Sequence, residues 1–302
     1  MNIEELKKYL EDRPYSKKMG AGLLAKRTHS SVDDVRRAKL VAYPKQKKAL
    51  PKILLFDLET APMVVYAWER FDTNIGLDQT ISEPFILAYS AKWLYDNDVQ
   101  AEVLTPGEAV GRNDYRLVKA LWKLLNEADI VVAYNGDKAD LPWLRSRFLV
   151  YGMPPTKPFI SVDPYKTVKR QFGFTSGKLD AIAMYLRLQD RKLKTDFSLW
   201  RGCMEGNEKS LDSMLKYNAQ DVKVLEEVYL KLRPYITNHP NVGNILDMDA
   251  CVRCGSERFE KIDGYYYTNV NRYPLFRCMD CGSVFRGRRG EKVKVEHTTC
   301  AR

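Results

Sequence analysis

Two carboxylates, Asp57 and Glu59, directly follow a run of aliphatic residues in the segment ILLFDLET. Successive side chains of a strand alternate between its two faces, so these acids, two residues apart, would share one face. Beside an apolar run that face is poorly hydrated, and two like charges repel one another unless a positive charge lies between them. A bound divalent metal is the usual solution. The alternative is an acidic strand end that runs into a turn at Pro62.

Two further acids occupy positions where a helix would present them. An apolar strand is expected to end at Asn135, and a helix is expected to begin near Asp140. Tyr217 and Asp221 are four residues apart in a strongly helical pattern, so both would project from one face of that helix. These residue types can bind hard metal ions, but each pattern alone is also compatible with ordinary buried acids paired to arginine.

Four of the six cysteines form two Cys-x2-Cys pairs, Cys251 with Cys254 and Cys278 with Cys281, and a glycine follows each pair. No export signal is visible, so the cysteines favour metal binding or free thiols over a disulfide framework. Two such pairs predict a tetrahedral zinc site with four cysteine ligands. Because four thiolates leave no coordination position open, we interpret the zinc as structural.

The segment around these cysteines is rich in aromatic and basic residues. Three consecutive tyrosines begin at Tyr265, and the basic stretch FRGRRGEKVK begins at Phe285. About half of the aromatic residues are expected to form the small core of the zinc unit. The others, beside the arginines, would be able to stack on bases and contact phosphates.

The net charge of +10 is concentrated at the two ends of the chain. Residues 1–52 hold 14 Lys/Arg against 6 Asp/Glu, residues 251–302 hold 11 against 6, and residues 53–250 hold 24 against 27. Basic flanks suit a polyanion, because neutralised phosphates release condensed counterions. The alternative is that the basic tails only keep the protein soluble. The residues predicted to contact nucleic acid are Asn135, Arg36, Arg37, Arg286, Arg288 and Arg289.

Periodicity predicts a sheet with helices packed on it in the central region. The predicted elements are strands at 53–60, 63–70, 85–94 and 99–104, a helix at 114–128, a buried strand at 129–135, and mostly helix from there to about 236. The basic run 187–197 reads as a solvated helix end, although its position before Tyr217 would suit a groove for a nucleic-acid strand. The fold class is therefore α/β, with a mixed sheet flanked by helices.

Smaller units are predicted on both sides of this region. Near the N-terminus, Ser31 would cap a second basic helix, so that a helix-turn-helix and a plain helical hairpin are both possible; Leu24, Ala25, Val32 and Val35 would face inward. The predicted divisions are a helical unit at 1–42, a basic linker at 43–52, the α/β domain at 53–240, the zinc ribbon at 248–290 and a basic tail at 291–302.

The three acidic motifs together resemble those of the DEDDy-type 3′–5′ exonucleases. These enzymes belong to the ribonuclease H-like superfamily and include the proofreading domains of family B DNA polymerases. The resemblance covers residues 53–236, and the segment KLDAIAMYL and Asp163 add to it. Many relatives have Phe before the acid of the second motif, where this chain has Ala139. Asp137 lies nearby, but Asp140 fits the motif better.

The resemblance implies a two-metal nuclease site. Asp57, Glu59, Asp140 and Asp221 would hold two Mg²⁺ or Mn²⁺ ions, which activate a water and stabilise the leaving 3′ oxygen. Tyr217, together with Glu59, would orient the attacking water, since a neutral phenol is a better positioner than base at pH 7.

The sequence therefore predicts a metal-dependent exonuclease that removes 5′-mononucleotides from DNA 3′ ends, with RNA also possible as substrate. The chain is similar to bacteriophage-encoded members of this group, which would act in the bacterial or phage-infected host cytoplasm, alone or with replication or recombination proteins in trans. No membrane-spanning run is visible. The alternative is a non-catalytic nucleic-acid-binding protein on the same scaffold.

Overall fold

The computed structural model describes residues 1–42, 49–71, 73–94 and 96–291. They fall into two compact units, residues 1–49 and residues 50–302. No helix among the described residues is long and apolar enough to cross a membrane.

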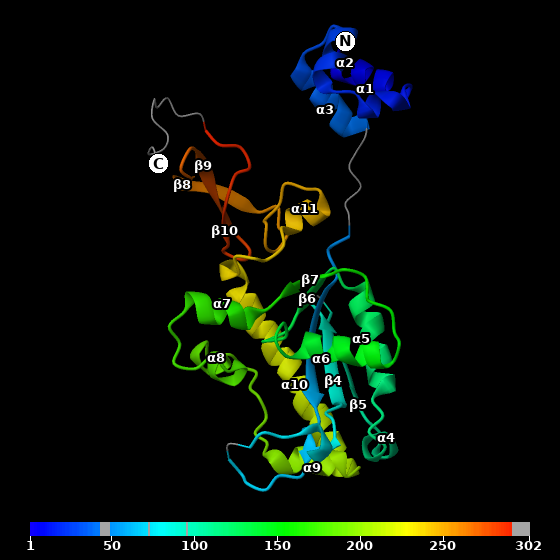
Figure 1. Cartoon of the computed structure of the whole chain (residues 1–302). Helices are drawn as coiled ribbons and strands as arrows, with labels where there is room; N and C mark the ends of the chain where they lie inside the picture. Colours follow the sequence, from blue (N-terminus) through cyan, green and yellow to red (C-terminus); the bar gives the residue numbers. More distant parts are fainter. Residues whose placement is uncertain (43–48, 72, 95, 292–302) are drawn as a thin grey trace, which may run out of the picture. The chain divides into compact units, whose positions relative to one another are not determined.

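The N-terminal unit is helical. It contains α1 (Ile3–Glu11), the short 3-10 helix η1 (Pro14–Lys18), α2 (Ala21–Thr28) and α3 (Val32–Ala42), as Figure 1 shows. Its small core contains the buried side chains of Leu6, Leu10, Leu24, Ala25, Val35 and Ala38. Val32 was expected to face inward as well, but it is 39% exposed, so that prediction is wrong.

The turn between α2 and α3 is set by two side chains. Ser31 caps α3, because its Oγ accepts a hydrogen bond of 3.0 Å from the Asp34 amide. His29 takes the left-handed conformation (φ 50°) that glycine usually provides at the end of a helix. Two helices joined by residues 29–31 are compatible with both a helix-turn-helix and a helical hairpin.

A five-stranded mixed sheet forms the centre of the second unit. Its strand order is β5–β4–β1–β6–β7, in which β1 is antiparallel to β4 and parallel to β6. The strands are β1 (Ile53–Thr60), β4 (Ile86–Trp93), β5 (Val99–Val103), β6 (Ile130–Val132) and β7 (Ile160–Val162). The predicted α/β class, with a mixed sheet flanked by helices, is confirmed.

Helices cover both faces of this sheet, and the 25-residue α10 is the longest of those described (Figure 1). The helices are α4 (Pro106–Val110), α5 (Tyr115–Glu127), α6 (Asp140–Val150), α7 (Pro164–Gln171), α8 (Leu179–Tyr185), α9 (Phe197–Met204), α10 (Glu208–Leu232), η3 (Arg233–Tyr235) and α11 (Val242–Leu246). Apolar residues recur on the inner face of each long helix, as amphipathic packing requires.

The alternation of side chains along β1 separates two cores. Leu54 and Phe56 pack with α5 and α6, whereas Ile53 and Leu55 pack with α7, α8 and the C-terminal half of α10. Asp57 and Glu59 continue the second series, so β1 directs them to the face covered by α10.

The segment after β1 differs from the prediction. A strand was expected over 63–70, but only β2 (Val64–Val65) forms, paired with β3 (Thr80–Ser82), which the 3-10 helix η2 (Leu77–Gln79) precedes. Trp68 is 97% exposed and Tyr66 73% exposed. The aromatic residues that suggested a strand therefore have no core against which to pack.

A small antiparallel sheet lies near the C-terminus of the described chain. It consists of β8 (Phe259–Tyr267), β9 (Arg272–Cys278) and β10 (Val284–Arg286), in the order β10–β9–β8. Phe259, Phe276 and Phe285 pack against one another on one face of it. This sheet carries the second cysteine pair.

Candidate active site and cysteine cluster

Asp57 is positioned by two neighbouring elements. It pairs with Ser90 on β4, and Ser90 Oγ donates a hydrogen bond of 2.7 Å to the backbone oxygen of Asn218 on α10. Asn218 Nδ2 in turn donates a hydrogen bond of 2.7 Å to Asp57 Oδ2. The carboxylate is thereby oriented by the same helix that supplies the other side of the site.

Three carboxylates meet at this point. Asp57, Glu59 and Asp221 each offer an oxygen, and these atoms all lie within 4.8 Å of one another. Asp221 is fully buried on α10, and Tyr217 lies one helical turn before it with its ring almost buried. The strand motif and the helix motif, which are far apart in the sequence, are thus brought together in one cluster.

The electrostatics of the cluster are unfavourable for three ionised acids. Burial, followed by the charges of Asp140, Glu59 and Asp221, raises the pKa of Asp57 well above its ordinary value. Burial and the charge of Asp221 raise the pKa of Glu59 to about 7. Burial also raises the pKa of Asp221. Burial is the largest cause of each shift, because it removes the water that would stabilise the ionised form.

Asp140 lies at the edge of the cluster, at the first residue of α6. It is not one of the three acids within 4.8 Å, but its charge is the largest electrostatic contribution to the raised pKa of Asp57. Burial raises the pKa of Asp140 itself to about 6, although hydrogen bonds from the backbone partly offset this. Asp137, the neighbouring acid, instead forms an ion pair with Lys166 (2.5 Å), which lowers its pKa.

Lys192 is a member of the site that the sequence did not predict. Its Nζ lies 2.5 Å from Asp221 Oδ2 and 5.3 Å from the centre of the Tyr217 ring. The basic run 187–197 was expected to be a solvated helix end, but residues 187–196 form no helix, and Gln220 of α10 donates a hydrogen bond of 2.9 Å to Asp190 within it. The signal in the sequence that could have placed this run beside the site was its position shortly before Tyr217.

A second buried acid shows what a structural carboxylate looks like in this chain. Asp114 is fully buried, yet Arg147 Nη2 lies 2.5 Å from it, and the Tyr151 hydroxyl and the Ile86 amide donate hydrogen bonds of 2.6 and 2.8 Å. Asp57, Glu59 and Asp221 have no such arginine among the described residues, and Lys192 is the one cation that contacts them there. The three clustered acids therefore differ from Asp114, whose charge is balanced by an arginine and by hydrogen-bond donors.

A cleft of about 1000 Å³ opens beside the carboxylates. Its lining residues include Asp57, Tyr217 and Lys192, together with Asn135, Tyr134 and Tyr165. Asn135 has a left-handed backbone conformation (φ 60°), and its backbone N–H donates a hydrogen bond of 2.8 Å to Asp163 Oδ1. The cleft thus joins the acids to aromatic and polar side chains that suit a flexible polar ligand.

Residues 94–233 match the family model described as the RNase_H superfamily. This region includes Asp140, Tyr217 and Asp221 and ends at the close of α10. This part of the chain is therefore RNase H-like.

Two similar proteins are DNA polymerases. A DNA polymerase of Methanocaldococcus jannaschii is 38% identical over 48 residues, which is 16% of this chain and 3% of that protein. The structure of the family B DNA polymerase from the hyperthermophilic archaeon Pyrobaculum calidifontis aligns over 74% of this chain and 32% of that one, with a TM-score of 0.45 and 14% identity. The chain therefore spans only a small part of the length of either polymerase.

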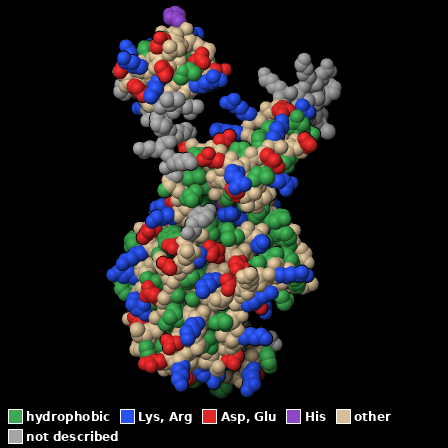
Figure 2. All heavy atoms as spheres, turned by 180° about the vertical axis from the view of Figure 1, so that it is seen from behind, with side chains coloured by type: hydrophobic (Ala, Val, Ile, Leu, Met, Phe, Trp, Pro, Cys, Tyr) green, Lys and Arg blue, Asp and Glu red, His purple; other side chains and the backbone are tan. Residues whose placement is uncertain are grey.

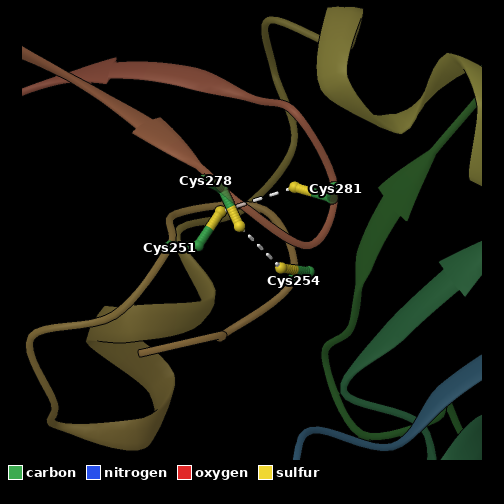
Figure 3. Close-up of side chains that lie close together, drawn as sticks. All are labelled: Cys251, Cys254, Cys278 and Cys281. Carbon is green, nitrogen blue, oxygen red and sulfur yellow. Dashed lines mark hydrogen bonds between the residues drawn. The ribbon is translucent and has the colours of Figure 1, made fainter. Parts of the chain in front are cut away.

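The four paired cysteines converge beyond the RNase H-like domain. Cys251 Sγ lies 3.6 Å from Cys281 Sγ, and Cys254 Sγ lies 3.6 Å from Cys278 Sγ, as Figure 3 shows. Tetrahedral zinc with Zn–S bonds of about 2.3 Å would place its sulfurs about 3.8 Å apart. The cluster therefore has nearly the dimensions of a four-thiolate metal site.

The two cysteine pairs have the same local geometry. The amides of Gly255 and Gly282 donate hydrogen bonds to the backbone oxygens of Cys251 and Cys278, at 2.9 and 3.0 Å. Both glycines have φ 76°, a conformation in which other residues are strained. The glycines noted in the sequence are thus required by the turns that direct the sulfurs inward.

The predicted nucleic-acid contacts are distributed over three places. Asn135 lies in the cleft, Arg37 is exposed on α3, and Arg286, Arg288 and Arg289 are exposed on and after β10. The side chain of Arg36 lies outside the described residues. Figure 2 shows basic and acidic side chains intermingled on the face it presents of the RNase H-like domain, in agreement with the nearly balanced charge of residues 53–250.

Proposed function

We propose that the chain is a metal-dependent 3′–5′ exonuclease that hydrolyses DNA and releases 5′-mononucleotides. The observation that carries the proposal is the group of three carboxylates within 4.8 Å of one another, at the edge of a cleft in an RNase H-like domain. The expected setting is a bacterial or phage-infected cytoplasm, with RNA as a possible second substrate and replication or recombination proteins as partners.

The residues present fit divalent metal ions. Carboxylate oxygens are the ligands that Mg²⁺ and Mn²⁺ prefer, and a bound cation would offset the burial and like-charge repulsion that raise the pKa values of Asp57 and Glu59. We assign Asp57, Glu59, Asp140 and Asp221 as ligands of two ions. Such ions, when bound, lower the pKa of water and neutralise charge on a phosphate.

The other side chains have roles that follow from their positions. The pKa of Tyr217 is raised by burial and by the charge of Asp221, so its hydroxyl stays neutral and positions water by hydrogen bonding. Glu59 would share this positioning. Lys192 provides the charge that a phosphate oxygen needs beside Asp221, and Asn135 lies where it can hydrogen-bond the terminal nucleotide.

The four cysteines fit one structural Zn²⁺, because four soft thiolates at tetrahedral spacing leave no position for a substrate. With this assignment, the zinc stabilises the fold of the small sheet, and the reaction takes place only at the carboxylates of the central domain. The assignment predicts one zinc ion per chain and no loss of zinc when the carboxylates are replaced.

The test is a time course on end-labelled single-stranded DNA with Mg²⁺, Mn²⁺ or no divalent metal. We expect 5′-mononucleotides from a linear strand, slower release from a strand with a 3′-terminal phosphorothioate, and no cutting of a circular strand. Rapid cutting of the circle would show an endonuclease. Tight DNA binding without any degradation in either metal would favour the alternative, a non-catalytic nucleic-acid-binding protein.

A further inference from the structure

The two faces of the C-terminal sheet have different chemistry. On one face, Phe259, Phe276 and Phe285 form the small core already described. On the other, Tyr266 of β8 lies directly opposite Tyr273 of β9. Leu275, two residues beyond Tyr273, pairs with Arg286 of β10, so these four side chains share one face.

The side chain of Arg286 is ordered by the two tyrosines. Its guanidinium carbon lies 4.2 Å from the centre of the Tyr273 ring and 5.4 Å from the centre of the Tyr266 ring. These are cation–π distances, and they fix the guanidinium group beside the rings. We call Tyr266, Tyr273 and Arg286 the tyrosine–arginine face.

This face is accessible and positively charged. Arg286 and Arg277 are exposed, and Tyr266 is 49% exposed. Among the described residues no carboxylate forms an ion pair with either arginine, although Glu260 lies opposite Arg277 on the neighbouring strand. Other acids of the segment are paired elsewhere, Asp280 with Arg258 and Glu291 with Lys261 and Arg272.

We propose that the tyrosine–arginine face is a binding platform for single-stranded nucleic acid, on which bases stack and phosphates contact Arg286 and Arg277. Exposed aromatic rings beside ordered arginines are what unpaired bases require, because each base offers a π-face and each nucleotide a negative charge. A duplex keeps its bases stacked inside, and an acidic peptide offers charge without a ring. This proposal rests on the proposed function in one respect: the platform would bind the same class of molecule, nucleic acid, that the central domain would degrade.

The experiment measures binding separately from degradation. Fluorescence anisotropy follows a labelled 15-nucleotide thymidine strand on the full chain without added divalent metal and without a chelator, which would remove zinc. Gel analysis checks that the strand stays intact. A failure of the proposed exonuclease activity would therefore leave this measurement unaffected.

Tyr266→Ala is expected to weaken binding about five- to 150-fold, the range for loss of one stacked base. The matched control is Tyr267→Ala, which removes the same ring from the adjacent residue, 69% exposed, whose side chain lies on the other face. We expect a change of less than about twofold there. Zinc content by native mass spectrometry shows whether each variant keeps its fold, and Tyr266→Leu replaces Tyr266→Ala if that variant loses zinc.

Variants of Arg286 distinguish the contribution of charge to binding from the contribution of base stacking. Arg286→Ala should weaken binding and reduce the slope of log Kd against log salt by about 0.7, the value for one phosphate contact on a single strand. Arg286→Lys should keep the slope but lose affinity. Equal effects of the Tyr266 and Tyr267 variants would overturn the proposal, as would equal binding of a duplex or full displacement by a polyglutamate peptide.

Discussion

The four acids of the site cost free energy in the absence of metal. Their raised pKa values mean that the folded protein favours the protonated carboxyl groups, and Lys192 offsets only part of the repulsion. A group whose pKa is higher in the folded state contributes stability at low pH that is lost as pH rises through the folded value. For Glu59 and Asp140 this loss falls between about pH 4 and pH 7.

Asp57→Asn should therefore abolish nuclease activity and stabilise the metal-free protein. The amide removes one buried charge, so Tm at pH 8 without divalent metal should rise by about 2–4 °C for each kcal/mol of repulsion removed. At pH 4.5 the difference should shrink, because the neighbouring acids are then protonated. The measurements are thermal unfolding at the two pH values and degradation of labelled DNA. A near wild-type rate would show that the site is assigned wrongly.

Asp140 and Asp137 provide a matched comparison within one turn. Asp140→Asn should reduce the Mg²⁺-dependent rate by at least about 100-fold and lower metal affinity, because it removes a proposed ligand. Asp137→Asn removes the charge of a partly buried acid that pairs with Lys166, and the amide oxygen can still accept the hydrogen bond from Ser161, so the rate should stay within about twofold and stability should change by less than about 1 kcal/mol. If the Asp137 variant were the inactive one, the second motif would be shifted by three residues.

In the proposed metal site, Lys192 would compete with a metal ion for Asp221. Lys192→Met should lower metal-free stability, because Asp221 then loses its counter-charge. The Mg²⁺ concentration for half-maximal rate should fall, because no ammonium group opposes metal binding. A titration of rate against Mg²⁺ gives this value, and a higher one would contradict the interpretation. Lys192 could not be identified from sequence because its contact depends on how an irregular segment folds back onto α10.

Several elements of the central domain were predictable because their sequence patterns are strong. β1 occupies 53–60 as expected, and α5 and β4 differ from their predicted bounds by one residue at each end. The predicted strand at 63–70 was wrong, because aromatic composition indicates a strand only where a second layer can cover the side chains. Sequence periodicity indicates which residues of one element are suited to burial. Whether another layer covers them depends on residues that are distant in the sequence.

Loss of the proposed zinc site should leave the proposed nuclease reaction itself unaffected. Replacing both Cys278 and Cys281 by Ser should abolish zinc binding, which would supply about 10 kcal/mol or more of folding free energy to the small sheet. The rate at saturating DNA should persist, because the carboxylates lie on β1, α6 and α10. Binding should weaken, more clearly at moderate than at low salt. Zinc content and rates over a salt series test this, and a rate that collapses at saturating DNA would contradict it.

The arrangement of the whole chain places its positive charge outside the domain that holds the acids. Composition alone showed this, because residues 1–52 and 251–302 are basic and residues 53–250 are not. In the proposed nuclease, such a distribution would separate affinity from catalysis, since phosphate contacts add to binding wherever they lie on the same substrate. What composition could not show was how the basic residues are displayed, for example that Arg286 is held beside two tyrosine rings.

Removal of residues 1–49 tests this separation at the scale of the molecule. The second unit begins at Leu50, and the Lys52 amide donates a hydrogen bond of 2.9 Å to Asp129, so the cut leaves the start of the sheet intact. The shortened chain should keep its Tm and its rate at saturating DNA. Its Kd should rise, and the slope of log Kd against log salt should decrease by about 0.7 for each phosphate of a single strand that the removed unit neutralises. An unchanged slope would mean that the basic N-terminal unit does not touch DNA, and that its charge serves only solubility.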